Sequence, residues 1–418
     1  MALKGSRTTQ IQPGWMYSTR LHAVMYSFLL VVTPFILLQN FLVEAVGNIS
    51  IATVELIGYK IPVIPVIALI FSTFALVVYR SYITKLRVLS VVIVILLIGL
   101  SQQITDYYFG HNFYDLQQNW HYIAYGIFSF MVYRDLLPRG FPLAKIMLIT
   151  FFSALLFSTF DETFQMKMSA RIFDMSDIAK DVWGTLMGMV ICYLGGRKER
   201  SLLADRKRIR HPKLKQYLKH PFSLLILLTV FALLFIIFSS LFADFPHWKY
   251  VILLTVGCFS LFFFAFHISQ FKWGKYGLIV IAAAGLLVQS YFFLKYRSGH
   301  IVHSQFGLTI YKGIPIVFFD VLIFPDGTLR PVDKKHYFNS RDRTFFLKQK
   351  TDIIIIGSGI NGNGGNGFPE KTANQFLYNK YTKRGTQVVI LKTPQACKLF
   401  NKLKKQNKNV LFVIHSTC

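Results

Sequence analysis

Long apolar runs separated by short polar connections dominate the first 300 residues of the chain. About 20 apolar residues in helical conformation are enough to cross the hydrocarbon core of a membrane. We therefore expect nine membrane spans, at 21–42, 62–79, 87–105, 121–137, 143–160, 177–194, 222–243, 250–269 and 276–294. No small-x-small cleavage site follows the first run, so we expect it to be a retained span rather than a signal peptide.

The pattern changes after residue 297 to short strand-like and helix-like segments. "IVFFDVLIFPDGTLRP" predicts two strands around a Pro-Asp-Gly turn, and "TDIIIIGSG" predicts a buried strand that leads into a glycine loop. "TQVVIL" and "NVLFVIH" predict further strands. Helices are predicted at "PEKTANQFLYNKYTKRG", with Pro369 near its start and Gly385 just past its end, and at "PQACKLFNKLKKQ".

These patterns predict a polytopic α-helical membrane protein of about nine spans with a C-terminal soluble α/β domain. The expected parts are an N-terminal tail at 1–20, a transmembrane domain at 21–195, a basic cytoplasmic loop at 196–221, three further transmembrane helices at 222–296 and the α/β domain at 297–418.

Composition and charge agree with a membrane protein. Only 16% of the residues are charged, against about 25% in soluble domains. The formal net charge is +27, and much of this excess lies in short loops beside the spans. Such loops mark the cytoplasmic side and attract anionic lipids, which places the N-terminus in the cytoplasm and disfavours nucleic acid as a partner. Nine spans would put the α/β domain outside the cell, but one span more or fewer reverses that side.

Cysteine usage suggests neither a disulfide scaffold nor a zinc site. The cysteines lie at 192, 258, 397 and 418 and form no CxxC pair.

Polar and ionisable residues gather at the predicted outer ends of four spans. These residues are Gln102, Gln103 and Asp106 after the third span, His121 at the start of the fourth, Asp161 and Glu162 after the fifth, and Asp177 at the start of the sixth. Because ionisable groups in membrane helices usually face protein or water and serve a function, this convergence is the main functional signal in the chain.

Helical periodicity places several of these residues on common faces. One face carries Ser158, Asp161, Glu162 and Gln165; another carries Asp174, Asp177, Asp181, Gly184 and Gly188; His121 and Tyr125 share a third. Small residues at this spacing allow a neighbouring helix to approach closely. We expect the last stripe to pack deep in the bilayer and to present its carboxylates nearer the surface.

Histidine among crowded carboxylates is suited to general acid–base chemistry or proton relay. We take His121, Glu162 and Asp177 as candidate catalytic residues. Candidate substrate- or anion-binding residues are Gln165, Arg171, Asp181 and Tyr125, with Arg171 as a counter-charge that could hold a phosphate or carboxylate. A simpler interpretation is that Asp174 or Asp177 only caps the sixth span. A metal site is disfavoured because no second histidine stands at ligand spacing.

At these residues the chain resembles the VanZ-like family. The matching motifs are "NWHYIAYG", "ETFQ", Arg171 and "DIAKDVWGTLMG", with Asp181 where the family usually has Asn. The resemblance covers roughly 20–195. It implies a small polytopic domain linked to the cell envelope and, in the founding member, to glycopeptide (teicoplanin) resistance. It implies no agreed reaction.

The C-terminal part resembles the Mth938-like family through "IFPDGTLRP", "DIIIIGSG" and "KTPQACKLFN". This resemblance implies a layered α/β fold and a role in interaction or assembly, since the family includes a mitochondrial complex I assembly factor. Gly357, Gly359 and Gly362 also fit G-x-G-x-x-G. No helix begins at that loop, so we expect a flexible or anion-binding loop and no bound cofactor.

The leading hypothesis is an envelope membrane protein whose outward-facing acidic pocket receives the polar headgroup of a lipid-linked or cell-wall precursor. The first alternative is a non-catalytic scaffold or assembly factor that docks a protein partner through residues 300–418. The second is a lipid or proton-coupled transporter. Membrane lipids are partners in every case.

Overall fold

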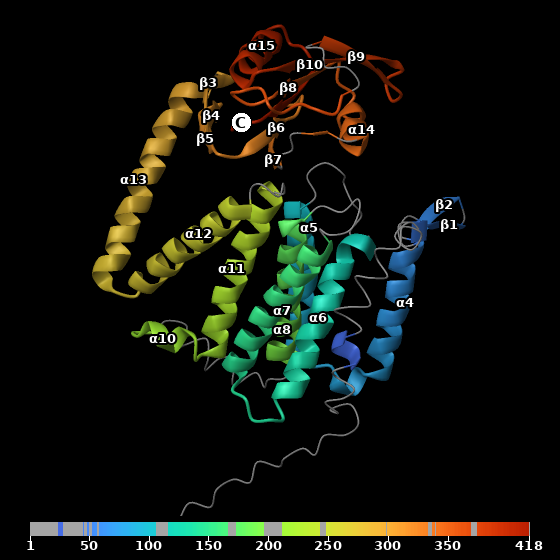
Figure 1. Cartoon of the computed structure of the whole chain (residues 1–418), viewed down its shortest axis with the longest axis vertical. Coiled ribbons are helices and arrows are strands. Elements are labelled where there is room, and N and C mark those ends of the chain that lie inside the picture. The colour runs from blue at the N-terminus through green and yellow to red at the C-terminus, as the bar shows by residue number, and fades with distance from the viewer. Residues whose placement is uncertain are drawn as a thin grey trace, which may run out of the picture. The chain divides into compact units, whose positions relative to one another are not determined.

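The structure is a computed structural model that describes residues 24–27, 45, 48–49, 52–56, 58–105, 116–165, 173–195, 211–242, 248–297, 299–332, 337–338, 340–368 and 374–417 (Figure 1). Contacts divide the chain into two compact units, one of residues 1–103 and 111–236 and the other of residues 104–110 and 237–418. Most of the predicted first span, together with Asp106 and Arg171, lies outside the described residues.

Apolar helices form most of the chain before residue 297. In order they are α4 (Val63–Val78), α5 (Lys85–Thr105), α6 (Leu116–Leu136), α7 (Leu143–Gln165), α8 (Met175–Gly195), α11 (Pro221–Leu241), α12 (Trp248–Ile268) and α13 (Lys272–Tyr296). A hairpin of β1 (Thr53–Leu56) and β2 (Tyr59–Pro62) precedes α4, the short 3-10 helix η3 (Arg80–Tyr82) follows it, and α10 (Leu214–Tyr217) precedes α11.

Six of these helices are long and apolar enough to cross a membrane within the part of the chain that the structure describes: α5, α7, α8, α11, α12 and α13. They indicate a multi-pass membrane protein. Eight of the nine predicted spans coincide with helices, but α4 is only 16 residues long and α6 carries many polar residues, so neither belongs to the six.

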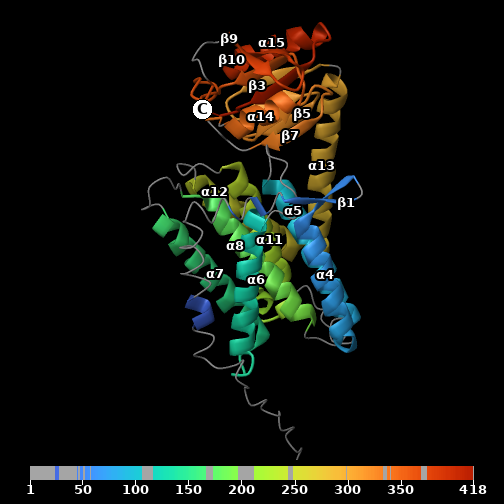
Figure 2. The same ribbon diagram turned by 90° about the vertical axis from the view of Figure 1, so that its right-hand side faces the viewer.

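Helix α8 is the centre of the first unit and packs against α6 and α7, which lie beside it in both views (Figures 1 and 2). A Cβ atom at Gly184 would lie 2.8 Å from the His121 carbonyl oxygen, and one at Gly188 would lie 2.6 Å from Ser129 Cβ. The two glycines therefore allow the close approach of α8 to α6 that their spacing predicted. The Trp183 indole on α8 is fully buried and donates a hydrogen bond to the Leu97 carbonyl oxygen of α5 at 3.0 Å.

The C-terminal domain contains a six-stranded sheet in the order β7-β6-β11-β8-β10-β9. Its strands are β6 (Asp320–Ile323), β7 (Leu329–Val332), β8 (Ile353–Gly357), β9 (Asn374–Asn379), β10 (Arg384–Leu391) and β11 (Val410–Ile414). β8 runs parallel to β10 and β11, and the other neighbours are antiparallel. The central strands "IIIIG" and "VLFVI" are almost wholly apolar because protein covers them.

A smaller antiparallel sheet and two helices complete this domain. The sheet consists of β3 (Ile301–Gln305), β4 (Leu308–Tyr311) and β5 (Ile314–Val317). Helix α15 (Thr393–Lys405) buries Ala396, Cys397 and Phe400 in a core that includes Phe412 of β11. Helix α14 (Ser340–Lys348) precedes β8. The small sheet and α14 were not predicted.

Most predicted elements of the domain are confirmed, but the helix predicted from Pro369 to Gly385 is wrong. Residues 374–379 form β9 and pair with β10 in an antiparallel hairpin, with Phe376 opposite Gln387 and Tyr378 opposite Gly385. Phe376 and Tyr378 are spaced two residues apart and are both strongly exposed, which is strand periodicity. Aromatic preference for strands and the free edge of β10 outweigh the helical signal.

Candidate functional site

The site is built on the first turns of α8, where Asp174 ends the preceding loop. The Ser176 N–H donates to Asp174 Oδ1 at 2.7 Å, which is the hydrogen bond of a helix N-cap. The capping interpretation of Asp174 is therefore confirmed. The backbone N–H of Asp174 donates to Glu162 Oε2 at 3.1 Å. The carboxylate of Glu162 therefore connects the end of α7 to the start of α8.

Asp181 joins three helices through its two carboxylate oxygens. His121 Nδ1 of α6 lies 2.8 Å from Oδ1, and the Ser158 hydroxyl of α7 donates to Oδ2 at 2.6 Å. Asp181 is 4% exposed and Ser158 is fully buried. Charge-assisted hydrogen bonds away from water are strong, so Asp181 fixes both the imidazole ring and the spacing of the helices.

The other imidazole nitrogen of His121 faces Asp177. Nε2 lies 3.8 Å from Asp177 Oδ1, which is longer than a hydrogen bond, and both side chains are 26% exposed. With Nδ1 bonded to Asp181, Nε2 points toward Asp177 and this partly open side, where it accepts a hydrogen bond when the imidazole is neutral and donates one when it is protonated. The arrangement can therefore receive a proton or a hydrogen bond from a bound group.

Lys180 supplies the cationic partner that the structure places in the cluster. Its Nζ lies 2.8 Å from Asp177 Oδ1, and its side chain is only 10% exposed. Lys180 was missed in the sequence, although its spacing of three residues from Asp177 on one helix is a recognised ion-pair signal. The predicted counter-charge Arg171 lies outside the described residues and stays a prediction.

The remaining predicted residues take different positions around the cluster. Glu162 is 3% exposed at the end of α7. The Gln165 amide donates to Asp161 Oδ2 at 3.1 Å, one turn before it on the same helix. Tyr125 is buried in a core with Phe128 of α6 and Ala154 of α7. The structure therefore brings His121, Glu162, Asp177 and Asp181 together, with Gln165 and Tyr125 at their margin.

Carboxylates outnumber cations in this cluster. Asp161, Glu162, Asp174, Asp177 and Asp181 accompany only His121 and Lys180 among the described residues. No three His, Cys, Asp or Glu residues within that part of the chain are placed to hold a metal ion. The cluster is rich in acceptors, so it is suited to a group that donates hydrogen bonds or carries a positive charge.

An apolar groove of about 970 Å³ borders α6 and α8. Residues of α4, α5, α6 and α8 line it, among them Leu69, Ile98, Ile123, Ile127 and Met187. Asn119 is one of its few polar lining residues and accepts a hydrogen bond from Gln102 at 3.2 Å. Its size and lining are suited to a hydrocarbon chain.

Comparisons with known proteins leave the family of the chain open. No protein-family model matches this chain, and no curated protein matches it. Two solved structures are similar to it: one titled "MT938", with 23% identity, and the conserved hypothetical protein PH1505 from Pyrococcus horikoshii OT3, with 25% identity. Each match covers 28% of this chain and 98% of the other, at a TM-score of 0.23. At that score the likeness adds nothing to the account of the site.

Proposed function

We propose that the helical part of this chain binds the polar headgroup of a membrane lipid or lipid-linked precursor at the cluster around His121. The observation that carries the proposal is the buried hydrogen-bond system of His121, Asp181 and Ser158, which joins three helices near their ends. Buried polar networks in membrane helices are costly unless every member has a partner. This network is satisfied internally and still directs His121 Nε2 to the partly open side.

The excess of carboxylates indicates the chemistry of the headgroup. Ionised carboxylates only accept hydrogen bonds, so hydroxyl or amino groups fit the cluster better than a phosphate does. A glycosyl or amino headgroup could donate to Asp177 and to His121 Nε2, which are 3.8 Å apart. The resemblance to the VanZ-like family, which is linked to the cell envelope, agrees with such a substrate class.

The apolar groove supports a lipid rather than a free sugar or amine. It contacts α6 and α8, the helices that carry His121 and Asp177, and it reaches Asn119 two residues before His121. A hydrocarbon chain in this groove would hold its headgroup near the same ends of the helices. We therefore propose an amphiphilic ligand.

The test is the lipid that stays with the protein on extraction. Full-length protein would be taken from its membrane into polymer nanodiscs, and the retained lipids would be quantified by mass spectrometry. We expect one lipid with a hydroxyl- or amine-bearing headgroup to be enriched over the bulk membrane. His121→Ala and Glu162→Gln should abolish this enrichment.

The matched control is Asp135→Ala at the other end of α6, where Asp135 pairs with Arg139 across one exposed turn. Enrichment should persist in this variant. The same lipid profile in wild type and in all three variants, with normal accumulation in the membrane, would remove the proposal.

A protein-docking role for the α/β domain is a second candidate function. β9 is an edge strand of the six-stranded sheet, and Phe376 and Tyr378 on it are 73% and 71% exposed. Exposed edges with large apolar side chains are common sites for an added partner strand. Phe376→Ala with Tyr378→Ala should abolish partner capture and leave lipid retention intact. Deletion of 300–418 should abolish function entirely if the protein is only a scaffold.

A further inference from the structure

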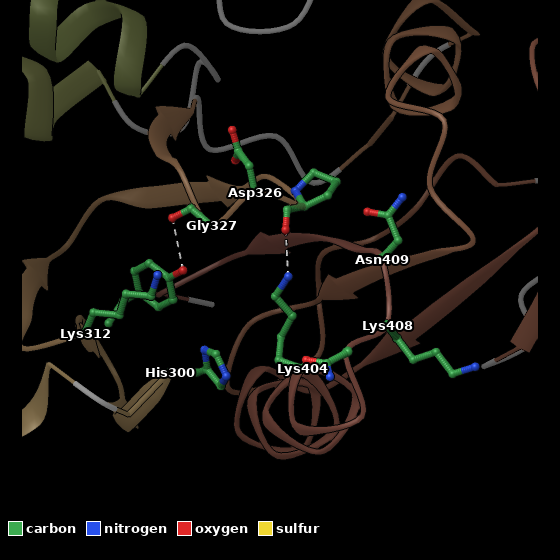
Figure 3. A pocket seen from close by; sticks show the side chains of 10 residues that line it. His300, Lys312, Asp326, Gly327, Lys404, Lys408 and Asn409 are labelled. Carbon is green, nitrogen blue, oxygen red and sulfur yellow. Dashed lines mark hydrogen bonds between the residues drawn. The ribbon is translucent and has the colours of Figure 1, made fainter.

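A cleft of about 350 Å³ lies in the C-terminal domain, away from the β9 edge (Figure 3). Four separate segments form it: His300 before β3, the β4–β5 turn at Lys312, the β6–β7 turn at 325–327, and the end of α15 with the loop that follows it. Its volume is in the range of small-ligand sites. We name it the lysine cleft. Its basic lining residues are His300, Lys312, Lys404 and Lys408, and the Lys408 side chain extends away from the other three in Figure 3.

The amines of Lys312 and Lys404 converge on the same turn. Lys404 Nζ donates to the Pro325 carbonyl oxygen at 2.7 Å. Lys312 Nζ lies 3.0 Å from the position that a Cβ atom on Gly327 would take. Each ammonium group has three donors, so each retains hydrogen-bonding capacity for a bound group. Two cations thus border one hollow from opposite walls.

Few acidic groups offset the positive charge of this cleft. Asp326 is the one carboxylate in its lining, and its side chain points away from the hollow in Figure 3. Thr328 donates to Asp326 Oδ1 through both its backbone N–H, at 2.8 Å, and its hydroxyl, at 2.7 Å. These hydrogen bonds lower the pKa of Asp326, so it stays ionised while its charge is held at the β6–β7 turn.

The walls of the cleft are held in place before any ligand arrives. The Lys312 N–H donates to the His300 carbonyl oxygen at 2.8 Å, and the Tyr311 hydroxyl donates to the Gly327 carbonyl oxygen at 3.1 Å. Asn401 of α15 makes two hydrogen bonds to the backbone of Ile301, at 2.9 and 2.7 Å. A binding site with fixed walls loses little conformational entropy on binding.

The plainest explanation of basic residues here is the C-terminus of α15, whose dipole favours cations. That explanation covers Lys402, Lys404 and Lys405, which lie in the last turn. It does not cover Lys312, which lies in the β4–β5 turn and has a φ of 47°, a left-handed conformation that normally favours Gly or Asn. It also leaves out His300, whose Nδ1 is buried without a hydrogen-bond partner among the described residues.

Electrostatic crowding of these basic groups favours the binding of an anion. Burial and the neighbouring Lys312 lower the pKa of Lys404, with Asp326 acting in the opposite direction. Burial and the charges of Lys312, Lys404 and Lys405 lower the pKa of His300. An anion between these groups would relieve their mutual repulsion.

We propose that the lysine cleft binds the phosphate group of a phosphomonoester between Lys312 and Lys404, with His300 at its side. The proposal is independent of the cluster around His121, which is acidic and lies in the other unit. A free phosphorylated molecule and the headgroup of a phosphomonoester lipid such as phosphatidic acid offer the same chemistry.

The experiment uses the full chain in phosphatidylcholine nanodiscs, titrated with inorganic phosphate and with glycerol 3-phosphate by calorimetry. We expect saturable binding of one equivalent, weakened about tenfold or more in Lys312→Gln with Lys404→Gln, because charge-assisted hydrogen bonds carry the affinity. Lys312→Arg with Lys404→Arg should restore most of the binding. Wild-type protein that shows no saturable binding below about 10 mM overturns the proposal whatever the variants do.

The matched control is Lys398→Gln with Lys402→Gln, which removes the same charge from exposed positions of the same helix outside the cleft. Residues 297–418 contain 19 Lys and Arg against 6 Asp and Glu, so unspecific attraction must be measured separately. An equal loss of affinity in the control pair would assign binding to bulk charge and overturn the proposal. Circular dichroism and thermal melting confirm folding of each variant.

The source of the phosphate is distinguished by the lipid of the nanodisc. Replacing part of the phosphatidylcholine by phosphatidic acid should abolish phosphate binding by competition if the cleft accepts a lipid headgroup. Unchanged phosphate affinity would assign the cleft to a soluble phosphomonoester.

Discussion

The cluster around His121 and the lysine cleft are both polar sites, but their charges are arranged in opposite ways. In the helical cluster, Asp181 and Asp177 each have a partner 2.8 Å away, from His121 and Lys180. In the lysine cleft, two ammonium groups and an imidazole border a hollow whose one lining carboxylate points away.

This difference follows from what surrounds each site. Helix α8 is enclosed by α6 and α7, and a charge there without a partner would be strongly destabilising. The lysine cleft lies at a surface where water solvates the amines, so crowded cations are tolerated. The charges of the first site are therefore paired within the protein, whereas those of the second are left to water or to a bound anion.

Removal of the Asp181 carboxylate should have the largest effect on stability, and it tests whether the charges of the cluster around His121 are paired within the protein. Asp181→Ala leaves buried Ser158 and partly buried His121 without their acceptor, so we expect a loss of about 3 kcal/mol in the free energy of unfolding. Asp181→Asn keeps an acceptor oxygen and should cost about 1 kcal/mol. Thermal unfolding in mild detergent measures both.

The control for this prediction is Asp135→Ala, which breaks the pair with Arg139 one turn further along, where the Asp135 and Arg139 side chains are 17% and 48% exposed. Exposed pairs contribute about 0–1 kcal/mol, so this variant should resemble wild type. Equal stability of Asp181→Ala and Asp135→Ala would show that the helical cluster is not a buried, paired site.

A substitution that forces α6 away from α8 should have the next largest effect on stability. A Cβ atom at Gly188 would lie 2.5 Å from the Gly126 carbonyl oxygen, so Gly188→Ala should destabilise the helical unit by about 1–3 kcal/mol. Gly257→Ala on α12 is the counterpart, because nothing lies within 4 Å of its added Cβ, and helix propensity should make it neutral or slightly stabilising. Similar melting temperatures for the two variants would refute the close contact.

Relief of backbone strain at Lys312 should have a smaller effect of opposite sign. Lys312→Asn suits a φ of 47° and removes a crowded cation, so we expect the domain to gain about 0.5–1 kcal/mol while phosphate affinity falls. Denaturant unfolding and calorimetry on the same samples measure the two quantities. A variant that loses stability together with affinity would give Lys312 a structural role instead.

The smallest expected effect is the change of anion affinity of the lysine cleft with pH. The pKa of His300 lies below its ordinary value because of burial and of Lys312, Lys404 and Lys405. The imidazole is therefore neutral at pH 7.5 and gains a charge only as the pH falls through that lowered pKa. Sulfate stays a dianion over this range, so its affinity should rise a few-fold toward pH 5 in wild type. The rise should be absent in His300→Gln. An identical rise in this variant would show that His300 is not the group whose protonation raises the affinity.

Helical periodicity accounts for what the sequence predicted correctly. The acidic and glycine stripe from Asp174 to Gly188 predicted which face of α8 packs against α6. The predicted alternation of the spans placed the start of the helix that carries His121 at the same end as this stripe. Lys180 was not predicted because its partner Asp177 lies on the same helix, whereas the convergence of span ends relates charges from different segments. The short length of α4 and the polarity of α6 likewise limit a count of spans made from hydropathy alone.

The α/β domain shows where local patterns fail. The segment that forms β9 has helix-compatible spacing, and the free edge of β10 together with the strand preference of its aromatic residues makes it a strand. The lysine cleft could not be predicted because its residues come from positions 300, 312, 327 and 404, and no local pattern relates them. Sites built on the ends of a few helices can be recognised in a sequence through helical periodicity, whereas sites built from turns require the fold.

The most direct test of the account is a cryo-electron microscopy map of the full-length protein in polymer nanodiscs cut from its native membrane. The account predicts headgroup density within hydrogen-bonding distance of His121 Nε2 and Asp177, continuous with a hydrocarbon chain in the groove beside Ile123 and Ile127. A map in which the cluster holds only water, with lipid confined to the outer rim of the helices, would contradict it.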